Sequence, residues 1–436
     1  MEQALSFAIS KKALQKRLEQ SPSILFILYV SISAFSVYAC MYGFRKPFTS
    51  ASYNGLYILG VSYKTILVIS QVIGYVISKF YGIKFIATMQ AEKRAINIII
   101  LIGIAWLSLL LFAIVPFPYN FIFMFINGLP LGMVWGLVFG FIEGRKYTEL
   151  MGAVLATSFI FASGLAKTVG KWLVLGLHIN EWQMPFMAGL LFILPLIISV
   201  WLLQKTPPPD EEDKAIRTIR KPMHAIERKK FLHQFAIILI PVITAYSLLT
   251  ILRDFCEDFA NELWIEVGFK SNAAIFTETS TIISLLVLLL VGSFFLFKNN
   301  YRAFQFAHVL IFIGFLMALF ATLAYQLHVI SSLVWFLLAT SGLYLGYVPY
   351  NCLYFERLLA TYKVQGNVGF VMYIADAVGY LGTVFILLVK EFISIKYSWV
   401  NFFITLFYIT SIIGMCLIVW GARASVLTYK KYQLCN

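Results

Sequence analysis

The sequence predicts an all-α polytopic membrane protein with twelve transmembrane helices in two six-helix halves. Three observations lead to this prediction. Hydrophobic residues make up 61% of the 436 residues, charged residues make up only 12%, and the apolar residues fall into long runs. A soluble domain carries about 25% charged residues. This chain therefore has too little polar surface to face water, whereas an apolar surface suits a bilayer.

Twelve apolar stretches are long enough to cross a bilayer, which takes about 20 residues in a helix. We place the first six near residues 23–46, 62–81, 96–115, 118–142, 149–170 and 184–204. We place the second six near residues 233–256, 272–297, 302–325, 330–355, 366–389 and 398–422. The charged, proline-rich segment between the two sets cannot lie in hydrocarbon, where unpaired polar groups are too costly.

This division gives five segments along the chain. They are an N-terminal tail at 1–22, a six-helix half at 23–204, a linker at 205–232, a second half at 233–424 and a C-terminal tail at 425–436. Loops rich in Lys and Arg stay in the cytosol. With both tails and the linker on one side, that side collects 25 of the 34 Lys and Arg residues. We therefore expect both termini to be cytosolic. We also expect the protein to be a monomer in the cell (plasma or inner) membrane.

The composition and motifs also exclude several classes of function. A net charge of +14 would suggest a nucleic-acid partner in a soluble protein, but the basic residues here lie between apolar runs, where they suit topology and anionic lipid. The five cysteines are scattered without a Cys/His spacing, so we expect no disulfide framework and no metal site. No nucleotide-binding motif or local catalytic signature occurs, and we expect no cofactor and no enzymatic activity.

A short internal repeat indicates that the two halves are similar. The segment Leu131-Gly132-Met133-Val134 matches Leu345-Gly346-Tyr347-Val348 at an offset of 214 residues. Both segments lie in the fourth span of their half. Two six-helix halves in the same orientation are the architecture of major facilitator transporters.

Charged residues inside the predicted spans are candidate functional positions, because burying one in a membrane costs roughly 2.5–3.5 kcal/mol. Arg45 and Lys46 end the first span, and Arg253 and Asp258 lie at the end of the seventh. Each cluster could also be an interfacial anchor that marks a helix end. Under the repeat, however, Arg45 and Arg253 face each other, and two guanidinium forks suit a tetrahedral oxyanion.

Four further charges lie within the spans. Lys79 is late in the second span and either snorkels to the headgroups or belongs to the site. Lys167 in the fifth span and Glu278 in the eighth are predicted to pair when the non-cytosolic side is closed, because these helices adjoin in major facilitator folds. Asp376 in the eleventh span is either a structural polar contact or a proton- or substrate-binding group.

Short motifs in both halves resemble those of one family, in the same order along the chain. Tyr42-x-x-Arg45-Lys46-x-Phe48 looks like that family's Tyr-x-x-Arg-Lys-Asn-Phe. Its other motifs are matched by Ser78-Lys79-Phe80, Leu252-Arg253 with Asp258, Thr277-Glu278-Thr279 and Gly379-Tyr380-Leu381-Gly382. The family is that of the organophosphate:inorganic phosphate antiporters, which are major facilitator members that include glycerol-3-phosphate and hexose-phosphate transporters.

The resemblance implies that Arg45 and Arg253 bind a phosphoryl group, and we place Tyr42 and Lys46 beside them. In that family, nearby lysines and acidic residues form salt bridges that rearrange during transport. The corresponding supporting charge network here would consist of Lys79, Lys167, Asp258, Glu278 and Asp376.

The sequence departs from that family at three places, which indicates a divergent branch. Residues 81–88 replace the Asp-Arg loop motif that follows the second helix. Phe161 stands in place of a pocket histidine in the fifth helix. Asp376 stands where the family has glycine.

The sequence thus favours a secondary transporter that moves a small anionic, phosphorylated metabolite by alternating access. Its counter-ion would be inorganic phosphate or a proton. Two alternatives remain open at this point: a non-transporting sensor or receptor on the same scaffold, and a proton-coupled carrier of a non-phosphate solute. A membrane-embedded enzyme would need a nucleophile, base or metal site, and none is found.

Overall fold

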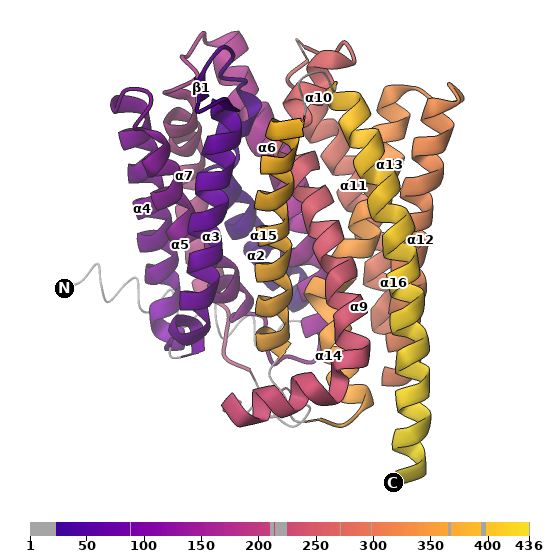
Figure 1. The fold of residues 1–436 in the computed structure, drawn as a ribbon. Helices are drawn as coiled ribbons and strands as arrows, with labels where there is room; N and C mark the ends of the chain where they lie inside the picture. The colour runs from indigo at the N-terminus through magenta and orange to yellow at the C-terminus, as the bar shows by residue number, and fades with distance from the viewer. Residues whose placement is uncertain are drawn as a thin grey trace, which may run out of the picture.

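The structure, a computed structural model, is almost entirely helical, and its long helices run side by side (Figure 1). It describes residues 23–87, 89–209, 213, 225–270, 272–297, 299–364, 368–393 and 398–435. The predicted N-terminal tail and the middle of the predicted linker lie outside these residues.

The first group of elements ends before the linker. Its long helices are α2 (Ser23–Tyr42), α3 (Tyr63–Ala87), α4 (Arg94–Ile114), α5 (Phe121–Phe139), α6 (Thr148–Gly176) and α7 (Met184–Gln204). Its short elements are η1 (Pro47–Ser50), η2 (Ala91–Lys93) and a two-stranded antiparallel hairpin of β1 (Tyr57–Ile58) and β2 (Val61–Ser62).

The second group of elements follows the linker. Its long helices are α9 (Ala225–Asp258), α11 (Ile275–Gly292), α12 (Asn300–Gln326), α13 (Ser332–Pro349), α15 (Val368–Ile393) and α16 (Trp399–Cys435). Its short elements are α10 (Ala260–Glu266), η3 (Ser293–Leu296), the π-helical turn η4 (Tyr350–Tyr354) and α14 (Phe355–Thr361).

The long helices confirm the predicted fold class. Within the described residues, eleven helices are long and apolar enough to cross a membrane. The 26-residue helix α15, at the position of the predicted eleventh span, runs alongside them (Figure 1). Many leucine and isoleucine side chains on these helices are exposed, as expected for a surface that faces lipid. The protein is therefore an all-α, multi-pass membrane protein.

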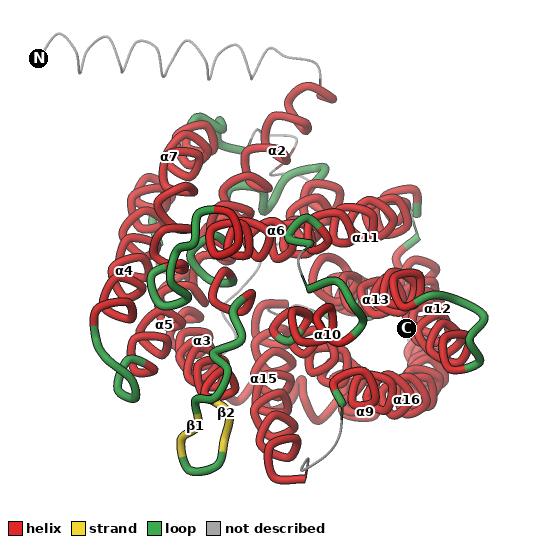
Figure 2. Tube along the Cα trace, turned by 90° about the horizontal axis from the view of Figure 1, so that it is seen from above, coloured by secondary structure: helices red, strands yellow, loops and turns green. Residues whose placement is uncertain are grey.

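Seen from above, α2–α7 gather on one side of the molecule and α9–α16 on the other (Figure 2). Within the first group α2 packs on α6 and α7, and within the second α9 packs on α15 and α16. Contacts between the groups are made mainly by α3 with α15 and by α6 with α11. These two pairs of helices therefore frame the interior of the protein.

Several helix ends differ from the predicted spans. The seventh span begins at Ala225, so residues 225–232 of the predicted linker are helical, and α16 continues through the predicted C-terminal tail to Cys435. Helical backbone satisfies its own hydrogen bonds, so a helix can continue into water where hydropathy falls. The first span ends at Tyr42, before the predicted 46, because the chain turns there inside the protein.

Candidate functional site

The end of α2 places Arg45 and Lys46 in the interior. A turn at 43–46 separates α2 from η1, which starts at Pro47, a residue without an N–H and suited to the first helical position. Gly43 is required for close contact with α7, since an added Cβ would lie 2.2 Å from the Phe192 ring.

Two buried amides satisfy the carbonyl groups that this helix end leaves free. Gln71 Nε2 donates to the Arg45 carbonyl oxygen at 3.1 Å, and Asn127 Nδ2 donates to that of Phe44 at 3.1 Å. The two amides also bond to each other at 2.8 Å. Residues from α3 and α5 therefore fix the backbone from which Arg45 projects.

The Arg45 side chain lies among aromatic rings. Its guanidinium carbon is 4.2 Å from the centre of the Tyr75 ring and 5.6 Å from that of Tyr42. Arg45 is only 5% exposed, and its Nε has no hydrogen-bond partner. Among the described residues, no carboxylate lies within ion-pair distance of it. Within the described structure, Arg45 is thus a buried cation that is held by cation–π contacts and has no ion pair.

Lys46 instead joins the two groups of helices. Its ammonium forms a hydrogen-bonded ion pair with Asp258, the last residue of α9, and lies 3.4 Å from Glu257. Glu257 also accepts a hydrogen bond from the Tyr344 hydroxyl at 2.9 Å. All four side chains are buried. The ion pair of Lys46 with Asp258 therefore connects the turn after α2 to the end of α9.

Arg253, on α9, is neutralised by a neighbour. Its Nη2 and Nε donate to Asp254 at 2.6 and 3.1 Å, and it also donates to the hydroxyls of Tyr347 and Tyr380. Asp254 accepts a further bond from Thr383 at 2.8 Å. Four bonds thus leave one of the five guanidinium N–H groups free.

The two arginines lie against one pair of aromatic rings. Tyr75 from α3 contacts Arg45, Tyr380 from α15 contacts Arg253, and the centres of the two tyrosine rings are 5.2 Å apart. The arginines therefore approach the same place from the two groups of helices. Neither the position of these rings between the arginines nor the pairing of Arg253 with Asp254 is predicted by the sequence.

Lys79 and Asp376 form a second buried link. Lys79 Nζ lies 3.0 Å from Asp376 Oδ2, so Lys79 does not snorkel to the headgroups, which was one of its two expected roles. Tyr246 donates to Asp376 at 2.5 Å, and its hydroxyl lies 3.1 Å from that of Tyr347. Because Tyr347 also bonds to Arg253, a continuous polar network runs from Lys79 to Arg253.

The predicted pair of Lys167 and Glu278 is absent from the described structure. Helices α6 and α11 do adjoin, as expected, and Thr277 Oγ1 bonds to Thr168 Oγ1 at 2.7 Å. Glu278, however, is exposed, whereas Lys167 is buried and donates to the Glu257 carbonyl oxygen at 2.9 Å. One residue turns a helix by about 100°, so the neighbour of Thr277 points away from α6.

Basic side chains exceed acidic ones in this buried region. Each member of the set is less than 9% exposed. The five basic residues are Arg45, Lys46, Lys79, Lys167 and Arg253, and the four acidic residues are Asp254, Glu257, Asp258 and Asp376. Since Lys46, Lys79 and Arg253 have ion-pair partners, the surplus of one positive charge is centred on Arg45 and Lys167.

Sequence reasoning missed several of these residues. Asp254 and Glu257 were visible as acidic neighbours of Arg253 and Asp258, and their i, i+3 spacing places them close to one face of a helix. Apart from Tyr42 and Tyr380, which lie in the family-like motifs, the tyrosines gave no such signal. This chain has 24 tyrosines, and in apolar spans they are indistinguishable from packing residues.

Comparison with solved structures identifies the fold. The chain is similar to a bacterial homologue of the human lysosomal transporter Spinster in an inward-facing, unoccupied conformation. The TM-score is 0.56 at 12% identity, over 94% of this chain and 98% of that one. It is also similar to a partially occluded, inward-open conformation of the xylose transporter XylE from E. coli. The TM-score is 0.57 at 13% identity, over 90% of this chain and 96% of that one. The fold is therefore that of the major facilitator transporters.

The sequence itself identifies a narrower group. Residues 47–425 match the sequence model of the "Family of unknown function (DUF5690)", and the chain belongs to this family. A comparison with curated protein sequences finds no match.

Proposed function

We propose that this protein is a secondary transporter that carries a small anion, such as a phosphorylated metabolite, by alternating access. The observation that carries the proposal is the buried guanidinium of Arg45, which has no carboxylate partner among the described residues. A charge in a membrane protein interior is costly unless it is paired or lines a water-filled path. A bound anion would supply the missing partner.

Arg45 would be the principal anchor of this anion. Its guanidinium donates no hydrogen bond to a described residue. That of Arg253 already donates four hydrogen bonds, to Asp254, Tyr347 and Tyr380. A phosphoryl oxygen pair fits the planar fork of a guanidinium. The resemblance of the Tyr42–Phe48 motif to that of organophosphate:phosphate antiporters supports a phosphorylated solute.

The links between the two helix groups suit alternating access. Lys46 with Asp258 joins the groups next to α10, while Lys79 with Asp376 joins them nearer to the start of α15. Glu149 and Arg357 form a further link at 2.7 Å near α14. In the proposed cycle residues 23–204 and 233–424 rock against each other, with both termini in the cytosol, and each state breaks one set of links. An anion between the halves would bias this balance by its different contacts in each state.

One observation favours a second candidate, a proton-coupled carrier. Asp376 is a buried carboxylate in the hydrogen-bonded network from Lys79 through Tyr246 and Tyr347 to Arg253. The hydroxyls of Tyr75 and Tyr380 are further titratable groups near Asp376. A proton taken up by Asp376 would release Lys79 and thereby alter the link between α3 and α15.

Uptake by proteoliposomes tests both candidates. Vesicles that contain the purified protein and internal phosphate are expected to take up labelled glycerol 3-phosphate, whereas empty vesicles are not. Uptake that needs internal phosphate supports exchange, and uptake driven by an inward proton gradient supports proton coupling. No uptake of any labelled organophosphate or phosphate under either gradient would contradict the proposed function.

A further inference from the structure

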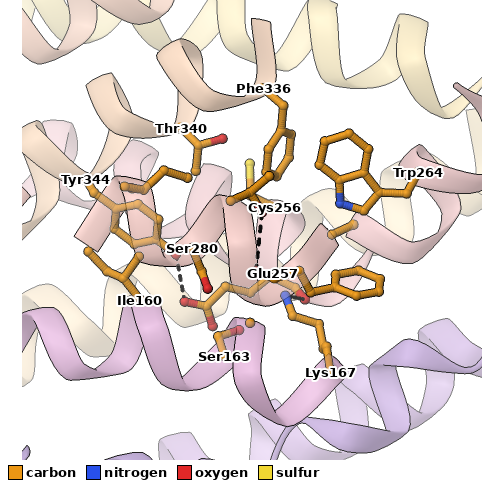
Figure 3. A pocket seen from close by; sticks show the side chains of 15 residues that line it. Ile160, Ser163, Lys167, Cys256, Glu257, Trp264, Ser280, Phe336, Thr340 and Tyr344 are labelled. Carbon is orange, nitrogen blue, oxygen red and sulfur yellow. Dashed lines mark hydrogen bonds between the residues drawn. The ribbon is translucent and has the colours of Figure 1, made fainter. Parts of the chain in front are cut away.

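A small cavity lies between α6, α9, α10, α11 and α13, and Figure 3 shows the side chains that line it. Its volume is about 30 Å³, which is room for about two water molecules. The walls come from both groups of helices, with α6 on one side and the others opposite. The cavity therefore lies at the interface that alternating access would open and close.

Three buried polar atoms in its wall have no hydrogen-bond partner among the described residues. They are Ser163 Oγ from α6, Trp264 Nε1 from α10 and Thr340 Oγ1 from α13. Each of these side chains is at most 3% exposed. Buried polar groups in proteins are nearly always bonded, because an unsatisfied one is costly. Three such atoms from three helices around one cavity indicate a polar ligand.

Lys167 adds a cation to the same wall. Its ammonium donates one bond, to the Glu257 carbonyl oxygen at 2.9 Å, and has three N–H groups in all. No carboxylate of the described residues lies within ion-pair distance of it. Figure 3 shows Lys167 and Ser163 on one side of the cavity and Trp264 and Thr340 on the other.

The groups left unused in the wall are mostly donors. The indole of Trp264 and the ammonium of Lys167 can only donate, and the two hydroxyls can do either. The carboxylate of Glu257 also lines the cavity, but it already accepts a bond from Tyr344 and faces Lys46. The cavity therefore favours an oxygen that accepts hydrogen bonds, such as a hydroxyl or a carboxylate.

The cavity adjoins the arginine site. Tyr344 lines the cavity, and Tyr347, one turn further along α13, bonds to Arg253. Phe159 of α6 contacts both tyrosine rings. The centre of its ring is 6.2 Å from that of Tyr344 and 5.8 Å from that of Tyr347. These three rings therefore lie between the cavity and Arg253, and a ligand of a few carbon atoms would have to pass them to reach from the arginines into the cavity.

We propose that this cavity is a second subsite, which binds a hydroxyl or carboxylate oxygen at the far end of the transported phosphate ester. Lys167, Trp264, Ser163 and Thr340 donate hydrogen bonds to that oxygen. The proposal rests on the proposed function and adds to it a requirement for a polar group at both ends of the solute.

Three probes of equal chain length test this inference: propyl phosphate, glycerol 3-phosphate and 3-phosphoglycerate. Binding to the full-length protein in detergent is measured by calorimetry. We expect glycerol 3-phosphate or 3-phosphoglycerate to bind about tenfold more tightly than propyl phosphate, the effect of about one hydrogen bond. Thr340→Val, Trp264→Phe and Ser163→Ala should each reduce this preference and leave the affinity for propyl phosphate unchanged.

Thr361→Val is the matched control, because Thr361 also has a buried, unpartnered hydroxyl but lies outside the cavity. It should leave the preference intact. Equal binding of the three probes by the wild type, or equal weakening of all three by the cavity variants, would overturn the subsite and leave the phosphate site standing. If no probe binds, the proposed function fails and this inference fails with it.

Discussion

Lys79 Nζ lies 3.0 Å from Asp376 Oδ2, and this ion pair ties α3 of the first helix group to α15 of the second. Both side chains are buried. Removing one partner of a buried pair leaves an uncompensated charge, whereas replacing both removes the charge altogether. The pair is therefore expected to behave as a unit in the folded protein.

Substitutions at this pair test that expectation. We expect Lys79→Met alone to destabilise the protein by about 3–5 kcal/mol, and the double variant Lys79→Met with Asp376→Leu to recover part of this loss. Thermal unfolding in detergent is the measurement. A double variant that is as unstable as the sum of the two single variants would show that the charges do not interact.

Asp376 also allows a test of proton coupling. If it carries the proton, Asp376→Asn abolishes uptake driven by a proton gradient and leaves exchange of substrate for substrate intact. Glu391→Gln is the matched control, because Glu391 is on the same helix but bonds to Ser62 and Thr65. A wild-type rate that does not change with the pH gradient would assign Asp376 a structural role instead.

The effect on stability of removing a buried carboxylate, that of Asp258, can be compared with the effect of removing an exposed one, that of Glu278. Asp258→Asn removes the carboxylate that Lys46 contacts and should cost about 3–5 kcal/mol. Glu278→Gln changes an exposed side chain and should alter stability by no more than about 0.5 kcal/mol. Unfolding temperatures of the two variants check this. A large loss in Glu278→Gln would restore the originally predicted ion pair with Lys167.

The orientation in the membrane rests on the distribution of Lys and Arg. A reporter inserted within 205–232 or fused after Asn436 is expected to report the cytosol. A reporter in the connection between α6 and α7, at 177–183, is expected to report the opposite side. Enzymatic reporters that are active on one side only give the answer. A non-cytosolic signal from the linker would contradict the proposed topology.

Much of the fold could be predicted from the sequence, because the thickness and the apolar interior of the bilayer determine the length and composition of each spanning helix. Each span needs an apolar run, and the runs gave the twelve helices. The ends of α9 and α16 could not be predicted in the same way, because their charged extensions have no hydropathy signal. The turn after α2 was also missed, since it depends on Gln71 and Asn127, which lie far away in the sequence.

In the candidate site, the sequence predicts the charged residues but not the partners with which they interact. Arg45, Arg253, Lys79 and Asp376 stood out because buried charge is costly in a membrane. Their partners depend on helix rotation and on contacts between distant helices. The predicted pair of Glu278 with Lys167 is absent from the described structure for this reason. Thr277 faces α6, and Glu278, one residue further along the helix, points away from it.

The central claim is that Arg45 binds the anion through its planar fork. An ammonium lacks this fork. Binding of labelled glycerol 3-phosphate and of inorganic phosphate to the purified protein is the most direct test, with Arg302→Lys, at an exposed arginine, as the control. We predict that wild type and Arg302→Lys bind, and that Arg45→Lys and Arg253→Lys remain folded but lose binding. Binding by Arg45→Lys with the affinity of the wild type would contradict the account.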